Sequence, residues 1–239
     1  MTIKSYLSDP VTLRGMATVT RIIESGAGPS VIRLDRTLFH AQGGGQKADR
    51  GRIGPATVLQ VAHNEDDVDH VVESTAGLTP GQAVQLEIDE PWRRLNSAYH
   101  TAGHLLAAVV ETIYPELKAV SGHQWPGEAR VEFSGADKAS GLSADAINAR
   151  LTADVAAALP VVIVGDPYLD RAIRIGDYDA IPCGGVHVPS LGEIQDVTVL
   201  AIKAKGGRLR VSYVVDAPEV SIWCRAGDST PQAVRHAFA

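Results

Sequence analysis

The stretch EPWRRLNSAYHTAGHLLAAVVETIYP, residues 90–115, decides how this chain is organised. Apolar side chains recur in it every three or four residues, which predicts an amphipathic helix from Trp92 to Tyr114. Pro91 suits the first position of such a helix, and Pro115 ends it. The apolar stripe consists of Trp92, Leu95, Tyr99, Ala102, Leu106, Val110 and Ile113.

Two histidines of this predicted helix indicate a metal site. His100 and His104 are four residues apart, so they share one helical face with their Cβ atoms about 5–6 Å apart. They lie at the edge of the apolar stripe, neither in the core nor fully in water. Cys183 and His187 repeat the spacing in a Cys-Gly-Gly-Val-His turn, where glycines let the backbone fold closely around an ion. Three histidines and one cysteine are typical ligands of tetrahedral Zn²⁺.

The number of candidate ligands bears on what the zinc does. A catalytic zinc usually keeps one position open and has three protein ligands, whereas this sequence offers four. We expect His100, His104 and Cys183 to be firm ligands with a catalytic role. His187 is either the fourth ligand or the neighbour of an exchangeable water.

A run of glycines is the second feature with chemical content. Residues 40–46 read His-Ala-Gln-Gly-Gly-Gly-Gln. Three consecutive glycines leave backbone N–H groups open to a ligand, although a simple turn between strands has the same composition. The run lacks the ending of a phosphate-binding Walker loop. We expect Gly43, Gly44, Gly45 and Gln46 to shape a substrate pocket without binding metal.

The rest of the chain predicts an α+β fold. Residues 11–88 contain short alternating strands and no helical pattern, which favours a small barrel or a curled sheet. After the central helix, Ser143 suits the N-cap of a second helix through Ala158. Helices on one side of an antiparallel sheet give the α+β class. Strands are predicted at residues 11–23, 30–39, 57–62, 69–73, 83–88, 129–133, 160–165, 194–203 and 208–215, the last two joined as a hairpin.

Composition restricts the compartment and the partners. The chain has 239 residues, two cysteines and a net charge of −6. No apolar run approaches the roughly 20 residues of a membrane helix, and the N-terminus lacks an apolar signal core. We therefore expect a cytoplasmic protein without a membrane partner, and no obligate protein partner is evident.

The net charge argues against an extended grip on nucleic acid, but one small basic patch stands out. Four cations occur within eight residues of the predicted hairpin, without an acidic residue among them: Lys203, Lys205, Arg208 and Arg210. We expect them to contact the phosphates of an RNA. A solvated hairpin edge is the alternative of about equal weight.

The motifs resemble, in combination, those of the alanyl-tRNA editing proteins. The resemblance rests on the Phe39–Gln46 glycine motif with Asp49 and Gly51, on the His100–Leu106 helix, and on the Cys183–His187 turn. Order and spacing match over about residues 10–215. Gly192-Glu193-Ile194 and the basic hairpin that follows also fit.

The resemblance implies a two-part architecture and a hydrolase. A β-barrel like those of translation proteins, residues 1–90, would precede an α+β zinc-binding editing domain, residues 91–225, and a tail, residues 226–239. The domain is shared with alanyl- and threonyl-tRNA synthetases. Such proteins remove serine or glycine wrongly attached to alanine tRNA, so the expected partner is an aminoacylated tRNA.

Two features depart from the family pattern. Gly103 replaces the more usual Thr or Ser in the helical motif, and residues 121–127 do not match the well-known members. These departures bear on the amino acid removed more than on metal binding. Two other functions stay open: a zinc hydrolase of the same fold acting on a small ester or amide, and a non-catalytic tRNA-binding module.

Overall fold

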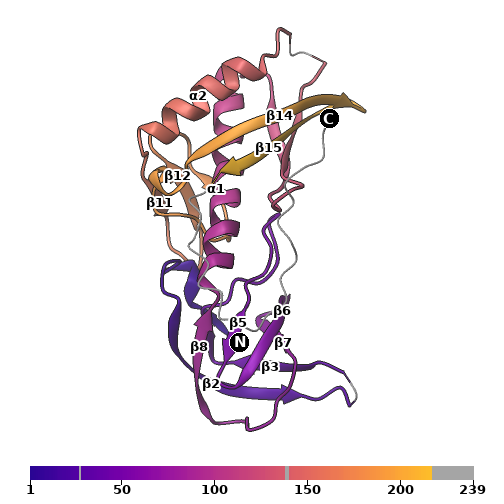
Figure 1. Cartoon of the computed structure of the whole chain (residues 1–239), viewed down its shortest axis with the longest axis vertical. Helices are drawn as coiled ribbons and strands as arrows, with labels where there is room; N and C mark the ends of the chain where they lie inside the picture. Colours follow the sequence, from indigo (N-terminus) through magenta and orange to yellow (C-terminus); the bar gives the residue numbers. More distant parts are fainter. Residues whose placement is uncertain (27, 138–139, 217–239) are drawn as a thin grey trace, which may run out of the picture.

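Two α-helices and mostly antiparallel strands make up the described part of the chain, which is residues 1–26, 28–137 and 140–216 of this computed structural model. The class is therefore α+β, as the sequence predicted. A group of strands lies at one end, a sheet with the second helix lies at the other, and the long helix α1 connects them (Figure 1). The expected tail, residues 226–239, lies outside the described residues.

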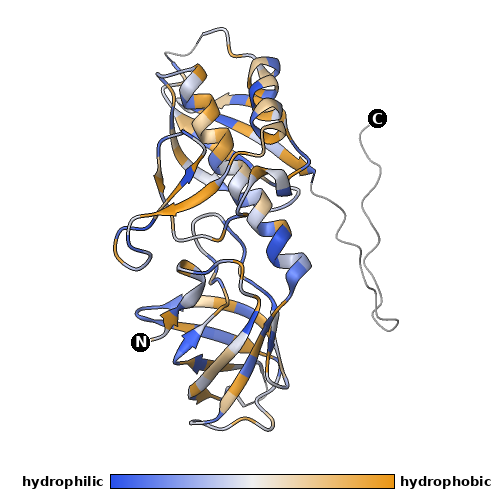
Figure 2. Cartoon of the chain, turned by 90° about the vertical axis from the view of Figure 1, so that its left-hand side faces the viewer, coloured by the Kyte–Doolittle hydropathy of each residue, from blue (hydrophilic) through white to orange (hydrophobic). Residues whose placement is uncertain are grey.

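Six strands of the N-terminal half pair in a ring. Each strand is hydrogen-bonded to the next, and β8 pairs back with β2, so the sheet closes into a barrel. Its apolar residues alternate with polar ones along the strands (Figure 2), and the inward set forms a buried cluster between residues 17 and 88. The order around the ring is β2 (Arg14–Ile23), β3 (Ser30–Leu34), β7 (Asp67–Val72), β6 (Ala56–Asn64), β5 (Gly51–Ile53) and β8 (Ala83–Ile88).

The second half has its own core beneath a four-stranded sheet. Helix α1 (Glu90–Ile113) packs against three strands of this sheet, and α2 (Ala144–Ala156) packs on the fourth, β14. The buried cluster here draws on residues 98–215. The order in this sheet is β14 (Asp196–Lys205), β15 (Arg208–Asp216), β10 (Arg130–Ser134) and β9 (Lys118–His123).

Smaller elements complete the described chain. A three-stranded sheet precedes the turn that contains Cys183 and His187, and a short parallel pair of strands flanks the barrel. None of the described helices is long and apolar enough to cross a membrane. The elements are β1 (Ile3–Lys4), η1 (Ser5–Leu7), β4 (Arg36–Thr37), β11 (Val161–Val164), β12 (Ala172–Ile175), β13 (Ile181–Pro182) and η2 (Leu191–Glu193).

A side-chain cap starts each of the two helices, at the predicted residue in α2 and before the predicted start in α1. The Asp89 carboxylate accepts a hydrogen bond from Trp92 N at 3.0 Å, so α1 begins at Glu90, two residues before the prediction. The Ser143 hydroxyl accepts one from Ala146 N at 3.2 Å. Each cap satisfies one of the N–H groups that the first helical turn leaves without a partner.

The prediction was incomplete for short strands and wrong about one face of α1. It missed β1, β5, β9, β12 and β13, which are too short or too rich in exposed residues to show alternation. It placed both histidines at the edge of the apolar stripe, yet His100 is only 1% exposed. Loops from both halves of the molecule cover this face, which no helical pattern can reveal.

Candidate metal centre

Four potential metal ligands converge between α1 and the segment after β13. His100 and His104 lie one turn apart on α1, while Cys183 and His187 come from the glycine-containing turn. One ligand atom from each residue lies within 4.8 Å of the other three. Cys183 Sγ is 3.6 Å from His100 Nε2 and 3.4 Å from His187 Nε2. These four residues, called the metal cluster below, could therefore hold a metal ion.

Gly185 lets the turn approach the helix. A Cβ built on Gly185 would lie 2.2 Å from His100 Cε1, so no larger residue fits without displacing the imidazole. Gly185 N donates a hydrogen bond to Cys183 Sγ at 3.2 Å, which stabilises a thiolate at this position. Arg171 donates to Cys183 O and, at 2.8 Å, to Leu7 O, and so fixes the start of the turn against the N-terminal half.

Gln46 sets the orientation of His100 from the barrel side. Val186 N donates to Gln46 Oε1 at 2.9 Å, and Gln46 Nε2 donates to Val186 O at 3.1 Å, so the backbone fixes which end of the amide is oxygen. That oxygen lies 2.6 Å from His100 Nδ1. His100 must therefore carry its proton on Nδ1, and the lone pair on Nε2 points into the cluster.

Thr101 lies behind His187 in a similar way. Its hydroxyl oxygen accepts a hydrogen bond from Val188 N at 3.2 Å and lies 3.1 Å from His187 Nδ1. A proton on Nδ1 donates to this oxygen and leaves His187 Nε2 free to face Cys183. Both rings are thus held with Nε2 toward the same point.

Burial keeps the imidazoles neutral, which is the form that binds metal. Burial, followed by the neighbouring imidazoles, lowers the pKa of His100 and of His187 well below the usual range, and burial lowers the pKa of His104 to about 4. Burial raises the pKa of the Cys183 thiol, so ion binding must displace its proton. The buried Nδ1 of His104 has no partner among the described residues. This donor set fits a zinc ion.

A buried ion pair joins α1 to the loop between β4 and β5, which contains the glycine motif. Arg93 binds both carboxylate oxygens of Asp49, at 2.9 and 2.6 Å, and donates to Leu38 O at 2.7 Å. Both charged side chains are 4% exposed. Sequence reasoning missed Arg93, although its position seven residues before His100 puts it on the same helical face. The pair holds the loop that carries Gln46.

Residues of the glycine loop contact both the metal cluster and a small cavity. Gly44 and His104 line a cavity of about 170 Å³, whose other walls come from α1, β9, β10, β13 and Gln124, the residue after β9. Gly43 instead lies against His63. Gln46 is 2% exposed and bonded to His100 and Val186, so the structure places it behind the metal cluster. Its expected contact with substrate stays a prediction.

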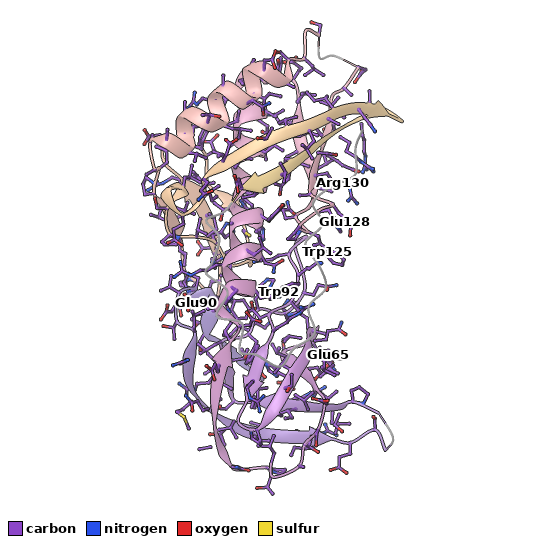
Figure 3. The ribbon with its side chains drawn as sticks, viewed as in Figure 1. Glu65, Glu90, Trp92, Trp125, Glu128 and Arg130 are labelled. Carbon is purple, nitrogen blue, oxygen red and sulfur yellow. The ribbon has the colours of Figure 1, made fainter. Side chains whose placement is uncertain are left out.

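Two tryptophans border the same loop. Lys47 Nζ lies 5.6 Å from the ring centre of Trp92, at the start of α1, and 4.7 Å from that of Trp125, after β9. Figure 3 labels both rings between the barrel and the upper sheet. Arg50 covers Trp92 at 3.6 Å, and His123 packs against Trp125. The loop is therefore held on its outer side by cation–π contacts.

The basic hairpin lies away from the metal cluster. Tyr213 of β15 points toward α1, where its hydroxyl donates to Tyr99 O at 2.8 Å. Strand alternation therefore puts Arg208 and Arg210 on the opposite face of the sheet. Both arginines pair with Glu132, at 3.4 and 2.8 Å. The expected contact of these cations with RNA phosphates stays a prediction.

Comparison with known proteins shows which families this chain resembles. Residues 171–210 match the family described as the threonyl and alanyl tRNA synthetase second additional domain, and this region includes Cys183 and His187. This stretch of the chain is therefore similar to that domain.

The relatives agree with the resemblance seen in the sequence. The alanyl-tRNA editing protein AlaX-M of Pyrococcus horikoshii is 29% identical over 84% of this chain and 91% of its own length. AlaX-L from the same organism is 27% identical over 85% of this chain and 55% of its own length. An alanine–tRNA ligase of Saccharopolyspora erythraea is 30% identical over 80% of this chain. The chain is homologous to the alanyl-tRNA editing proteins, as its motifs predicted.

The relatives differ greatly in length. The chain spans about a quarter of the ligase (24%) and about half of AlaX-L (55%), while it spans most of AlaX-M. The rest of the ligase lies outside the alignment.

Proposed function

We propose that this chain is a zinc-dependent hydrolase that removes wrongly attached serine or glycine from alanine tRNA. The convergence of four ligand atoms within 4.8 Å, beside a small cavity, carries the proposal. The homologous editing proteins supply the substrate class, because their names state alanyl-tRNA editing. The bond broken is the ester between the amino acid and the 3′ end of the tRNA.

The chain's own residues hold the metal and present it to the cavity. His100, His104 and Cys183 would be the firm, catalytic ligands, with His187 as the fourth ligand or beside an exchangeable water. When bound, zinc supplies Lewis-acid polarisation of the ester carbonyl or a water of lowered pKa. Gln46 and Thr101 would hold His100 and His187 in the tautomer that binds metal through Nε2. His104 lines the cavity, so the aminoacyl group would lie next to the metal.

We propose the domain division at residue 90. The two buried clusters draw on residues 17–88 and 98–215, which supports a barrel of the translation-protein type in residues 1–90 and an editing domain in residues 91–225. Gln46 and Asp49 reach from the first part into the second. The barrel would therefore be needed to complete the site.

For the tRNA we propose that the basic hairpin contacts phosphate. Lys203 lies opposite Arg210, and Lys205 opposite Arg208, which gathers the cations at one end of the hairpin. Since the arginines face away from α1, this contact would be to RNA beyond the aminoacyl end. Replacing all four residues should flatten the dependence of log K on log salt by about 0.7–0.9 for each lost phosphate contact. An unchanged slope would place the tRNA on another surface.

Release of amino acid from charged tRNA tests the proposal. Purified protein with full zinc is given seryl-, glycyl- and alanyl-charged alanine tRNA, with and without a chelator. We expect release of serine and glycine that the chelator abolishes and zinc restores. Intact charged tRNA after hours at saturating enzyme would refute the function.

A second candidate is hydrolysis of a small ester or amide. The net charge of −6 and the engagement of Arg208 and Arg210 by Glu132 favour it, because both weaken the case for RNA. The same assay with free amino-acid esters separates the two. Turnover of the esters without turnover of charged tRNA would select this candidate.

A further inference from the structure

Gln124 is a buried polar side chain that the metal site does not use. It follows β9 directly, is 5% exposed and lines the cavity beside His104. Its backbone N donates to Gly45 O at 3.0 Å, which attaches it to the glycine loop. Its Oε1 is buried and has no hydrogen-bond partner among the described residues. A buried acceptor without a partner is costly, and because Gln124 lines the cavity, a ligand there could supply the missing donor.

Three glycines from three elements make room for this one side chain. A Cβ on Gly45 would lie 2.2 Å from Gln124 Oε1, and a Cβ on Gly122 would lie 2.1 Å from its Nε2. A Cβ on Gly103, in the middle of α1, would lie 2.7 Å from its Cγ. Each of these contacts is closer than real Cβ atoms approach.

At two of these positions, glycine is required by the space that Gln124 occupies and not by the backbone conformation. Gly45 has a left-handed φ of 81°, where glycine is favoured anyway. Gly103 and Gly122 are not among the residues with positive φ. Glycine inside a helix or a strand destabilises it relative to alanine. Both elements therefore accept a local cost at the points where Gln124 packs against them.

We infer that Gln124 reads the side chain of the aminoacyl group, its Oε1 accepting a hydrogen bond from the hydroxyl of a seryl ester. This inference rests on the proposed function and names the residue that determines its specificity. The seryl hydroxyl is the donor that alanine lacks, so an alanyl ester leaves Oε1 unpaired in the cavity. Sites built to bond a substrate hydroxyl strongly reject the analogue without it. The two departures from the family pattern, Gly103 and residues 121–127, thus meet at one contact.

The test compares kcat/KM for seryl- and glycyl-charged alanine tRNA. Gln124→Met keeps the length of the side chain and removes its polar atoms. We expect the seryl-to-glycyl ratio of kcat/KM to fall about tenfold, the size of one hydrogen bond, with zinc content equal to that of wild type. Gln85→Met, on the exposed outer side of the barrel, is the matched control and should keep the wild-type ratio.

A second variant protects the test against misfolding. Gly103→Ala adds a methyl group where Gln124 lies, and should lower the same ratio while retaining zinc. An unchanged ratio in both variants would overturn the inference. So would an equal fall for both substrates, which would show that Oε1 binds the α-amino group that they share. Wild-type protein that is inactive on every charged tRNA would refute the proposed function itself, and this inference with it.

Discussion

His70 in the barrel and His187 in the metal cluster are both buried and both lie beside a threonine hydroxyl, yet their environments differ. His70 Nδ1 lies 3.0 Å from Ile32 O and so must donate, while Nε2 lies 2.8 Å from Thr37 Oγ1. Thr37 Oγ1 accepts from Phe39 N at 3.0 Å and gives its own proton to His70. Every polar atom of the ring has a partner.

The ring of His187 is oriented by the protein on one side, and its other nitrogen faces the other candidate ligands. Thr101 Oγ1 lies 3.1 Å from Nδ1, but Nε2 faces Cys183 Sγ, with the rings of His100 and His104 centred 4.6 and 4.7 Å away. Lone pairs that face one another across a buried space are unfavourable unless a cation lies between them. A buried histidine indicates a metal site when one nitrogen is oriented by the protein and the other faces further potential ligands.

Removing a cluster ligand should have the largest effect. We expect wild-type protein to bind one zinc per chain, and His100→Ala or Cys183→Ala to bind far less and to lose at least about a hundredfold in deacylation, beyond the range of an outer partner. Metal analysis and release of serine from charged tRNA measure both. His70→Gln is the control and should keep its zinc. Zinc content that is low and equal in all these proteins would remove the basis of the comparison.

The pH dependence of stability should show the contribution of His70, the buried histidine of the barrel. Burial lowers the pKa of His70 to about 4, whereas the unfolded chain has a value near 6.5. The unfolded state therefore binds more protons between these values, and stability falls as the pH drops from about 6.5 to 4. The maximum loss is about 3 kcal/mol, from 1.36 kcal/mol per pKa unit.

Urea unfolding of wild type and of His70→Gln at pH 7 and pH 4.5 measures this contribution. The variant is less stable at pH 7 because it loses the fitted ring, but its stability should depend less on pH. Equal pH dependence in the two proteins would show that His70 does not titrate as its burial requires.

Gln46→Ala should weaken zinc binding by about 10–100-fold, the range for a residue that orients a metal ligand. Without the amide oxygen, His100 is free to place its proton on Nε2 and to turn its lone pair away from the ion. Competition with a chromogenic chelator measures the affinity. Gln42→Ala, an exposed residue of the same loop, is the control. Wild-type affinity in Gln46→Ala would mean that the turn alone orients His100.

The sequence predicted which four side chains converge better than it predicted what supports them. Regular spacing identifies His100 with His104 and Cys183 with His187, because a helix turn and a tight turn fix local geometry. Arg93, Asp49 and Gln124 act across distances of more than 40 residues or through packing between elements, which no local pattern encodes. The barrel strands were predicted where side chains alternate, whereas β5 and β9 lack a clear alternation. The separation of the basic hairpin from the metal cluster depends on which face of the sheet meets α1.

The smallest effects should come from the two threonines, and they test the comparison most directly. Thr37 gives a proton to a neutral ring, whereas Thr101 would accept one from His187 when the other nitrogen of that ring binds zinc. Thr37→Val removes two buried hydrogen bonds, the one to His70 and the one from Phe39 N, and should lower stability by about 2 kcal/mol without changing zinc affinity. Thr101→Val should weaken zinc binding by about tenfold, the low end for an outer partner. Its effect on the stability of the zinc-free protein should be no larger than that of Thr37→Val, since each hydroxyl also accepts one backbone N–H. Chelator competition and urea unfolding on both variants give a two-by-two comparison. If the two variants change zinc affinity equally, the direction of the threonine–histidine hydrogen bond does not distinguish a structural histidine from a metal ligand.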